Sequence, residues 1–258
     1  MINFIKLYLG LFRRVVSSFL LSPFDEKERV RIATLYAVYQ ERKVTFPEDP
    51  YIIPKTDIFE IENQDTAIYE GVDECGFGHI TEFELKVICH IVRKYQPKTI
   101  FEIGTFEGRT TLNIALNTTA DAKIFTLDLP ASELDKTSMN IEAGEVAYVD
   151  KKESGGRFLG SPQKVKITQL YGDSGTYDFS LYANTIDFMF VDGSHAHDYV
   201  INDTEKALKM VKKGGVILWH DYTNWEGVKD VLNNFYKNHA GFSTLRHIGG
   251  TSIVMMIR

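Results

Sequence analysis

The chain has 258 residues, of which 44% are hydrophobic and 25% are charged, as in a globular protein large enough for one domain and an extension. Its formal net charge of −6 excludes a nucleic-acid binder that relies on a generally basic surface. Cys75 and Cys89 are too few for a disulfide scaffold and too far apart for a C-x-x-C site. We therefore expect buried thiols in a reducing compartment, which indicates a cytoplasmic location.

Residues 1–21 predict an amphipathic helix that is basic and mostly apolar. Its polar residues share one narrow arc of a helical wheel, and Lys6, Arg13 and Arg14 interrupt the segment too often for a membrane span. The segment also lacks the small-residue cleavage site of a secretory signal. Two interpretations stay open: the helix packs against the protein or a second subunit, or it lies peripherally at the inner membrane surface.

We expect a helical amino-terminal extension over residues 1–75, followed by a catalytic-type domain over residues 76–258. A second helix is predicted over residues 25–42, because Ser22 and Pro23 end the first one. The proline-rich and acidic stretch 46–73 then predicts an irregular connection.

The domain opens with a capping box at Thr81 and Glu84, which begins a helix that continues to about Tyr95. The next segment reads KTIFEIGTFEGRTT, in which a strand over Thr99–Ile103 breaks into a glycine turn before a helix over residues 110–117. Glycines in such a turn let a ligand approach the backbone closely, and the helix start offers unpaired N–H groups to an anion.

The glycines of this turn are Gly104 and Gly108, with Glu102 two residues before the first. A dinucleotide fingerprint would read G-x-G-x-x-G, whereas this turn reads E-I-G-T-F-E-G and resembles motif I of the class I S-adenosylmethionine-dependent methyltransferases. The resemblance implies that these residues and Thr105 contact the cofactor, with Thr110 near its methionine carboxylate. An ordinary strand-to-helix turn with two glycines is the alternative.

Two further strand ends carry candidate cofactor contacts. The strand Lys123–Leu127 ends in Asp128, whose carboxylate can accept hydrogen bonds from both hydroxyls of a ribose. A third strand over Val165–Leu170 precedes Asp173 and Ser174, in the loop that touches the adenine in methyltransferase folds. The alternatives are a solvated strand-end aspartate and a plain Gly-Asp-Ser turn.

A long insertion over residues 131–162 separates the second and third strands and carries a Gly155-Gly156 pair. An insertion of this length in a compact domain is usually a lid or a binding element, and disorder is the alternative. We expect it to help shape the acceptor site.

The strongest buried-strand pattern is IDFMFV at Ile186–Val191. A helix over residues 199–211 and a strand over Val216–Trp219 follow it. Two β-like runs at Phe242–Ile248 and Ser252–Ile257, separated by Gly-Gly-Thr, predict a hairpin at the end of the chain. An antiparallel hairpin that closes a parallel sheet distinguishes class I methyltransferases from dinucleotide dehydrogenases.

These segments together resemble the methyltransferase type 24 group of class I. The resemblance covers residues 76–258 and rests on GHITEFELKVICHIVRKYQPKTI, EIGTFEGRTT, YGDSGTYDFS and VDGSHAHDYVINDTEKALKMVKKGGVILWHDY. It implies a Rossmann-like α/β fold with a sheet of seven strands, mostly parallel with a carboxyl-terminal antiparallel hairpin, and helices on both faces. The implied cofactor is S-adenosyl-L-methionine.

Polar residues at two neighbouring strand ends predict the chemistry. Asp192 and Asp221 are expected about 5 Å apart beside the sulfonium methyl, where Asp192 also contacts the cofactor and both acids can share Mg²⁺ or another divalent cation. His220 is a further candidate ligand. His195 matches the histidine proposed as general base in related sugar O-methyltransferases, which have Glu-Asp where this chain has His220-Asp221. Alternatively, Asp192 caps a helix and the histidines only hydrogen-bond within their loops.

The sequence therefore predicts an enzyme that methylates a hydroxyl oxygen on a sugar, glycan precursor or natural product. A non-catalytic cofactor-binding or scaffold protein on the same fold is the first alternative, and the polar cluster argues against it. A nicotinamide dehydrogenase is disfavoured because the turn lacks a third glycine. The expected partners are a small-molecule or glycan acceptor, no nucleic acid, and either a membrane surface or a second copy of the chain at helix 1–21.

Overall fold

The computed structural model describes residues 50–57, 69–71 and 78–258. Residues 51–258 form one compact unit. The predicted helices over residues 1–21 and 25–42 lie outside the described residues, as does Cys75. No helix in the described part of the chain is long and apolar enough to cross a membrane.

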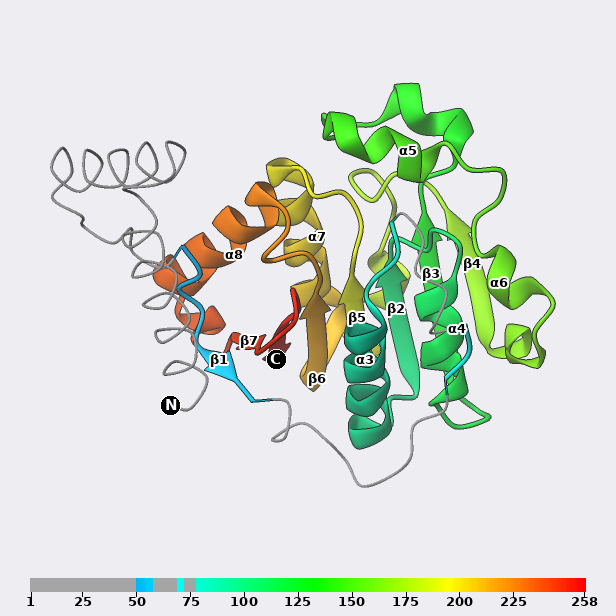
Figure 1. Ribbon diagram of the computed structural model, residues 1–258, viewed down its shortest axis with the longest axis horizontal. Helices are drawn as coiled ribbons and strands as arrows, with labels where there is room; N and C mark the ends of the chain where they lie inside the picture. The colour runs from blue at the N-terminus through cyan, green and yellow to red at the C-terminus, as the bar shows by residue number, and fades with distance from the viewer. Residues whose placement is uncertain (1–49, 58–68, 72–77) are drawn as a thin grey trace, which may run out of the picture. The chain divides into compact units, whose positions relative to one another are not determined.

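An eight-stranded sheet organises this unit, with the strand order β1-β7-β8-β6-β5-β2-β3-β4 (Figure 1). Strands β2 to β6 pair in parallel, and β8 lies antiparallel between β6 and β7. The Rossmann-like sheet with its antiparallel carboxyl-terminal hairpin is thus confirmed, and the short β1 adds an eighth strand beside β7. The strands are β1 Lys55–Thr56, β2 Thr99–Ile103, β3 Lys123–Asp128, β4 Ile167–Tyr171, β5 Ile186–Val191, β6 Val211–Trp219, β7 Arg246–Ile248 and β8 Val254–Ile257.

Helices cover both faces of the sheet, as predicted. Because side chains alternate along a strand, Ile100 and Phe188 point to one face while Phe101 and Met189 point to the other. The first face packs against α3 and α4, which lie in front of the sheet in Figure 1, and the second packs against α7 and α8. The helices are α3 Glu82–Tyr95, α4 Arg109–Leu116, α5 Val146–Val149, α6 Gly156–Leu159, α7 His197–Met210 and α8 Glu226–Asn238.

Local sequence accounts for the start of α3. The Thr81 hydroxyl accepts from the Glu84 backbone N–H at 3.2 Å, and the Glu84 carboxylate accepts from the Thr81 N–H at 3.1 Å, which completes the predicted capping box. Cys89 lies on the apolar face of this helix with its thiol buried, as expected.

Four strands begin at a different residue than predicted. Strand β7 begins at Arg246 and not at Phe242, because Phe242 ends the 3₁₀ helix Ala240–Phe242, and β8 begins at Val254 and not at Ser252. Strand β4 begins at Ile167 and not at Val165, because Pro162 and the residues after it form a 3₁₀ helix, Pro162–Lys166. Strand β6 begins at Val211 and not at Val216, because Val211 already pairs with Ile186 of β5. The pairing register then shifts, so that Val216 pairs with Phe188. A bulge of this kind lets one strand carry extra residues that an alternating pattern does not reveal.

The insertion over residues 131–162 is folded into short helices. It contains the 3₁₀ helices Ala131–Lys136 and Ala143–Glu145 in addition to α5 and α6. Several of its residues line the main pocket of the unit, so the expectation that it shapes a binding site agrees with its position.

Candidate active site

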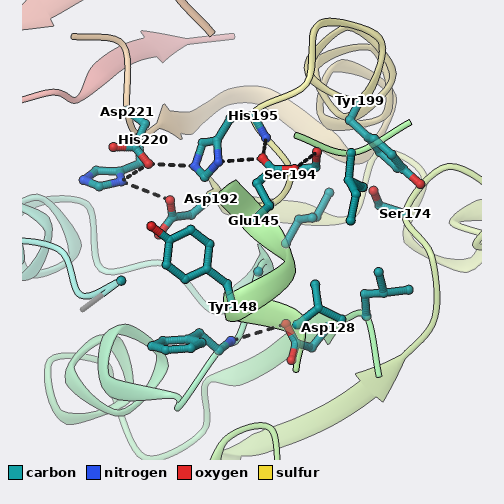
Figure 2. A pocket seen from close by; sticks show the side chains of 18 of the residues that line it. Asp128, Glu145, Tyr148, Ser174, Asp192, Ser194, His195, Tyr199, His220 and Asp221 are labelled. Atoms are coloured by element: carbon teal, nitrogen blue, oxygen red, sulfur yellow. Dashed lines mark hydrogen bonds and ion pairs between the residues drawn. The ribbon is translucent and has the colours of Figure 1, made fainter. Parts of the chain in front are cut away.

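A pocket of about 340 Å³ opens where β2, β3, β5 and β6 end. The carboxyl edge of a parallel α/β sheet is where such folds bind ligands, because the strand order reverses there and leaves a crevice. The turn after β2, the loops after β3 to β6, the start of α3 and the insertion all contribute to its walls. Figure 2 shows the polar side chains that these elements direct into the pocket.

The glycine turn after β2 has the tight geometry expected of it. Gly104 has a φ of +97°, and a Cβ added there would lie 1.9 Å from the Asp192 carbonyl oxygen. Gly108 has a φ of +83°, and its added Cβ would lie 2.6 Å from the Phe158 ring. Both positions therefore require glycine, and at these two positions no side chain separates the backbone of the turn from the cavities that it borders.

Glu102 lies beneath this turn, fully buried and outside the set of residues that line the pocket. One of its oxygens accepts hydrogen bonds from the hydroxyls of Thr111 and Thr126. Burial outweighs these bonds and raises the pKa of Glu102 to about 8. Thr105, which bonds to Thr126 at 2.6 Å, and Thr110 border a smaller cavity next to the pocket.

Asp128 reaches the pocket from the end of β3, as its predicted ribose-binding role requires. Its carboxylate lies 2.7 Å from Lys151 Nζ and accepts hydrogen bonds from the Ser154 hydroxyl and, at 3.3 Å, from the Phe106 N–H. Lys151 and Ser154 belong to the insertion. Asp128 thus ties the insertion to the sheet in this structure.

Asp173 and Ser174 also line the pocket, after β4. Asp173 accepts hydrogen bonds from the Ser138 N–H at 2.7 Å, the Gly175 N–H at 2.8 Å and the Tyr199 hydroxyl at 2.8 Å. Burial opposes the charge on this carboxylate, but these bonds outweigh it and lower the pKa of Asp173. Ser138 is a second attachment point for the insertion.

His195 lies at the centre of a buried polar cluster. Its Nδ1 is 2.7 Å from Glu145 Oε1, and its Nε2 is 2.7 Å from Asp221 Oδ2 (Figure 2). The Trp225 ring stacks on the imidazole with centroids 4.5 Å apart and planes inclined by 6°. Burial opposes a positive charge here, but Asp221 and Glu145 outweigh it and raise the pKa of His195 to about 9.

His220 occupies the space between the two strand-end acids. Its Nδ1 lies 3.0 Å from Asp192 Oδ1 and 3.2 Å from Asp221 Oδ2, and its Nε2 lies 3.5 Å from Glu84 Oε2. Burial opposes protonation, but these carboxylates outweigh it and raise the pKa of His220 well above its usual value. As an imidazolium, His220 supplies positive charge between the acids.

The structure brings Asp192 and Asp221 together as the strand order predicts. Asp221 has a φ of +64°, a conformation that is uncommon outside glycine and that occurs at functional sites. One ligand atom from each of Asp192, Asp221 and His195 lies within 4.8 Å of the others, close enough for one cation. His195 takes the place in this group that the sequence analysis gave to His220.

Three residues of the site lie outside the sequence-based prediction. Glu145 and Trp225 contact His195, and Glu84, predicted only as a helix cap, also contacts His220 and accepts from Ser252. No pattern in the sequence marks Glu145, because it lies in an insertion without periodicity, 50 positions from its partner. Trp225 follows the candidate acid Asp221 closely in the sequence, and this is the only sequence feature that indicates its position near the site.

Comparisons with known proteins agree with this architecture. A family model described as "Methyltransferase domain" matches residues 101–222. The chain is 41% identical to uncharacterized protein R132 of Acanthamoeba polyphaga mimivirus over 169 residues. This aligned region makes up 62% of this chain and 69% of that protein. The chain is 28% identical to a protein named caffeoyl-CoA O-methyltransferase from Stellaria longipes over 168 residues, and this aligned region makes up 63% of this chain. The match spans 60% of that relative's length.

A solved structure titled cofactor-bound Rv0187 from MTB has the same fold, with a TM-score of 0.51 and 15% identity over 71% of this chain and 83% of that chain. The strand order, the glycine turn and the matched domain all agree with the resemblance found in the sequence. The chain belongs to the methyltransferase type 24 family within the class I S-adenosylmethionine-dependent methyltransferases.

Proposed function

We propose that the chain transfers the methyl group of S-adenosylmethionine to a hydroxyl oxygen of a sugar, glycan precursor or natural product. One observation carries the proposal: a single pocket holds the glycine turn, the two predicted nucleoside-binding acids and the buried His195 cluster. A site for a nucleoside and a site for proton transfer thus share one cavity. A scaffold protein would have no use for the second of these.

The cofactor supplies a methyl group on a cationic sulfonium. In the proposed complex, the Gly104 turn lies along the methionine part, Asp128 accepts from the ribose hydroxyls, and Asp173 faces the adenine. The ribose hydroxyls replace Lys151 and Ser154 as partners of Asp128, because all of these donors compete for the same two oxygens. Binding of the cofactor and the position of the insertion are therefore linked.

His195 is the proposed general base. As the acceptor oxygen forms its bond to the methyl carbon, the bond from carbon to sulfur breaks and the hydroxyl proton must leave. Nε2 of His195 takes that proton. The ring must be neutral first. Because Nε2 and Asp221 Oδ2 are only 2.7 Å apart, we infer that the acceptor hydroxyl displaces the Asp221 carboxylate from Nε2 and so removes one of the two carboxylate partners that raise the pKa of His195.

Two carboxylate oxygens and one imidazole nitrogen also converge closely enough for a divalent cation, which would compete with the His220 imidazolium for the same two acids. Asp192 and Asp221 would hold it, and it would polarise the acceptor hydroxyl. His195 cannot serve as a full ligand and as the base through the same Nε2 atom. Dependence on a metal and the role of His195 are therefore tested together.

The first test concerns the cofactor. Asp128→Ala should weaken binding of S-adenosylhomocysteine about 10- to 100-fold, because a carboxylate that pairs two hydroxyls contributes roughly 1 to 3 kcal/mol. Calorimetric titration measures this affinity, and Asp230→Ala, at an exposed position on α8, is the matched control. Unchanged affinity in a folded Asp128→Ala variant would remove Asp128 from the cofactor site.

The second test concerns the reaction. Hydroxylated acceptors are screened with the methyl-labelled cofactor, and the best acceptor is then used with wild type and His195→Ala, each with and without EDTA. We expect transfer by the wild type and a loss of about 100-fold or more in His195→Ala. Full activity in His195→Ala would end the base assignment. Activity insensitive to EDTA would leave a metal-free methyltransferase, and cofactor binding without transfer to any acceptor would favour a non-catalytic protein.

A further inference from the structure

Glu145, at the end of the 3₁₀ helix Ala143–Glu145, is a buried carboxylate that the proposed reaction does not yet use. Its Oε1 accepts from the backbone N–H of His195 and lies 2.7 Å from the Nδ1 of the same residue. Its Oε2 accepts from the Ser194 hydroxyl at 2.8 Å and from the Glu142 N–H at 3.0 Å. Both oxygens are thus committed to the loop that carries His195.

This arrangement decides which ring nitrogen faces the pocket. A carboxylate can only accept, and each ring nitrogen has one 2.7 Å away: Glu145 is aligned with Nδ1 for a hydrogen bond, whereas Asp221 is not aligned with Nε2. The aligned contact therefore favours the proton of a neutral His195 ring on Nδ1 and the lone pair on Nε2. Nε2 is buried and, among the described residues, has no aligned hydrogen-bond partner, although Asp221 lies 2.7 Å away. The stacked Trp225 ring fixes the plane of the imidazole. The unused acceptor atom therefore points to the place where the hydroxyl enters.

We propose that Glu145 is the positioning residue of the reaction: it holds His195 as the Nδ1–H tautomer, with Nε2 directed at the acceptor hydroxyl. The inference rests on the proposed function. It also assigns a task to the insertion, because the segment that delivers Glu145 is attached to Asp128 through Lys151 and Ser154. A base on the sheet is thus oriented by a residue from the segment that covers the pocket.

The simplest competing explanation is that Glu145 only anchors the insertion. An anchor would affect folding and cofactor binding, since the insertion contacts Asp128 and Asp173, and it would leave the tautomer of His195 unchanged. A positioning residue affects the ring itself. The spectrum of the ring nitrogens separates the two explanations without any need for an acceptor.

The experiment compares wild type, Glu145→Gln, Glu145→Ala and the matched control Glu153→Gln, an exposed carboxylate of the same insertion. Long-range ¹H–¹⁵N spectra of the EDTA-treated protein are recorded at alkaline pH, where the ring is neutral, and the His195 signals are identified by their loss in His195→Asn. We expect the Nδ1–H tautomer in wild type and Glu153→Gln, and a mixture of both tautomers in Glu145→Ala. A retained single Nδ1–H tautomer in Glu145→Ala would overturn the proposal.

Two further readings complete the design. Affinity for S-adenosylhomocysteine should stay within about twofold in Glu145→Gln, which keeps the shape and the acceptor oxygen of the side chain. With the acceptor from the screen, kcat should fall about 10- to 100-fold in Glu145→Ala and less in Glu145→Gln, with KM nearly unchanged. A fall in cofactor affinity as large as the fall in kcat would instead support the anchor. A wild type that does not bind S-adenosylhomocysteine would refute the proposed function and leave the tautomer result standing.

Discussion

The buried carboxyl groups of this chain have different hydrogen-bonding partners, and the partner decides the direction in which the pKa shifts. Glu145 and Asp221 face an imidazole, and although burial opposes their charge, this contact lowers the pKa of each. Glu102 has only hydroxyl donors, so burial prevails and raises its pKa. Imidazole partners thus keep Glu145 and Asp221 charged, while Glu102, below the glycine turn, holds its proton at neutral pH.

The pKa of Glu102 predicts a dependence of stability on pH. Because its folded-state pKa of about 8 exceeds the ordinary value of 4.5, the folded protein binds this proton more tightly than the unfolded chain does. Its contribution to stability is complete below about pH 4.5 and is lost as the pH rises to about 8. In Glu102→Gln, the melting temperature should therefore decline less over this range than in wild type.

Thermal unfolding at several pH values measures this difference. Glu153→Gln, at an exposed position in the insertion, serves as the control and should follow the wild-type curve. Parallel curves for wild type and Glu102→Gln would contradict the assignment, whatever the constant offset between them.

At the scale of elements, the glycine turn allows the chain after β2 to pack closely against the chain after β5. The β2 strand leaves the sheet through Gly104, whose N–H donates to the Leu127 carbonyl of β3 while the Asp192 carbonyl passes beside its Cα. Two strand ends and a turn thus share a space that leaves no room for a side chain. The turn therefore serves packing as well as ligand access.

Gly104→Ala should accordingly destabilise the protein by about 2 kcal/mol or more, because the new Cβ meets backbone at 1.9 Å and the φ of +97° is unfavourable for alanine. Chemical denaturation gives the free energy of unfolding. Gly241→Ala is the matched control, since a Cβ at that position has no neighbour within 4 Å, and it should change the stability little. An equal loss of unfolding free energy in the two variants would show that the structure accommodates a Cβ at Gly104 without destabilisation.

Much of the fold follows from local patterns in the sequence. The capping box at Thr81 and the apolar run of β5 identify elements within a residue or two, because caps and continuous burial leave local signatures. The meeting of Asp192 with Asp221 is also predictable, since parallel strands end at the same edge. The contact of Glu145 with His195 is not, because it depends on how an aperiodic insertion folds back over 50 positions.

At the scale of the molecule, the unit 51–258 contains the whole sheet and the pocket. Deleting residues 1–21 should therefore leave a folded protein that binds S-adenosylhomocysteine. We propose that the deletion changes either association with anionic liposomes or the size of the oligomer, because a basic, apolar helix suits a membrane interface or a second subunit. Liposome sedimentation and light scattering measure these two properties. Loss of cofactor binding in the truncated chain would show that the helix is not peripheral.

The short strand β1 affects whether a second molecule can add a strand to the sheet. An uncovered strand offers a row of free N–H and C=O groups to which another chain can add. β7 donates through the N–H of His247 to the Pro54 carbonyl, and the N–H of Gly249 just beyond it donates to the Thr56 carbonyl, so two residues of β1 close this border of the sheet. Within the described residues, β1 and β4 are the two edge strands of the sheet. Strand β1 has only two residues, and at β4 the Lys164 ammonium donates to the Ile167 carbonyl, the first of the strand. A short edge and a positive charge both discourage the addition of a strand from a neighbouring molecule.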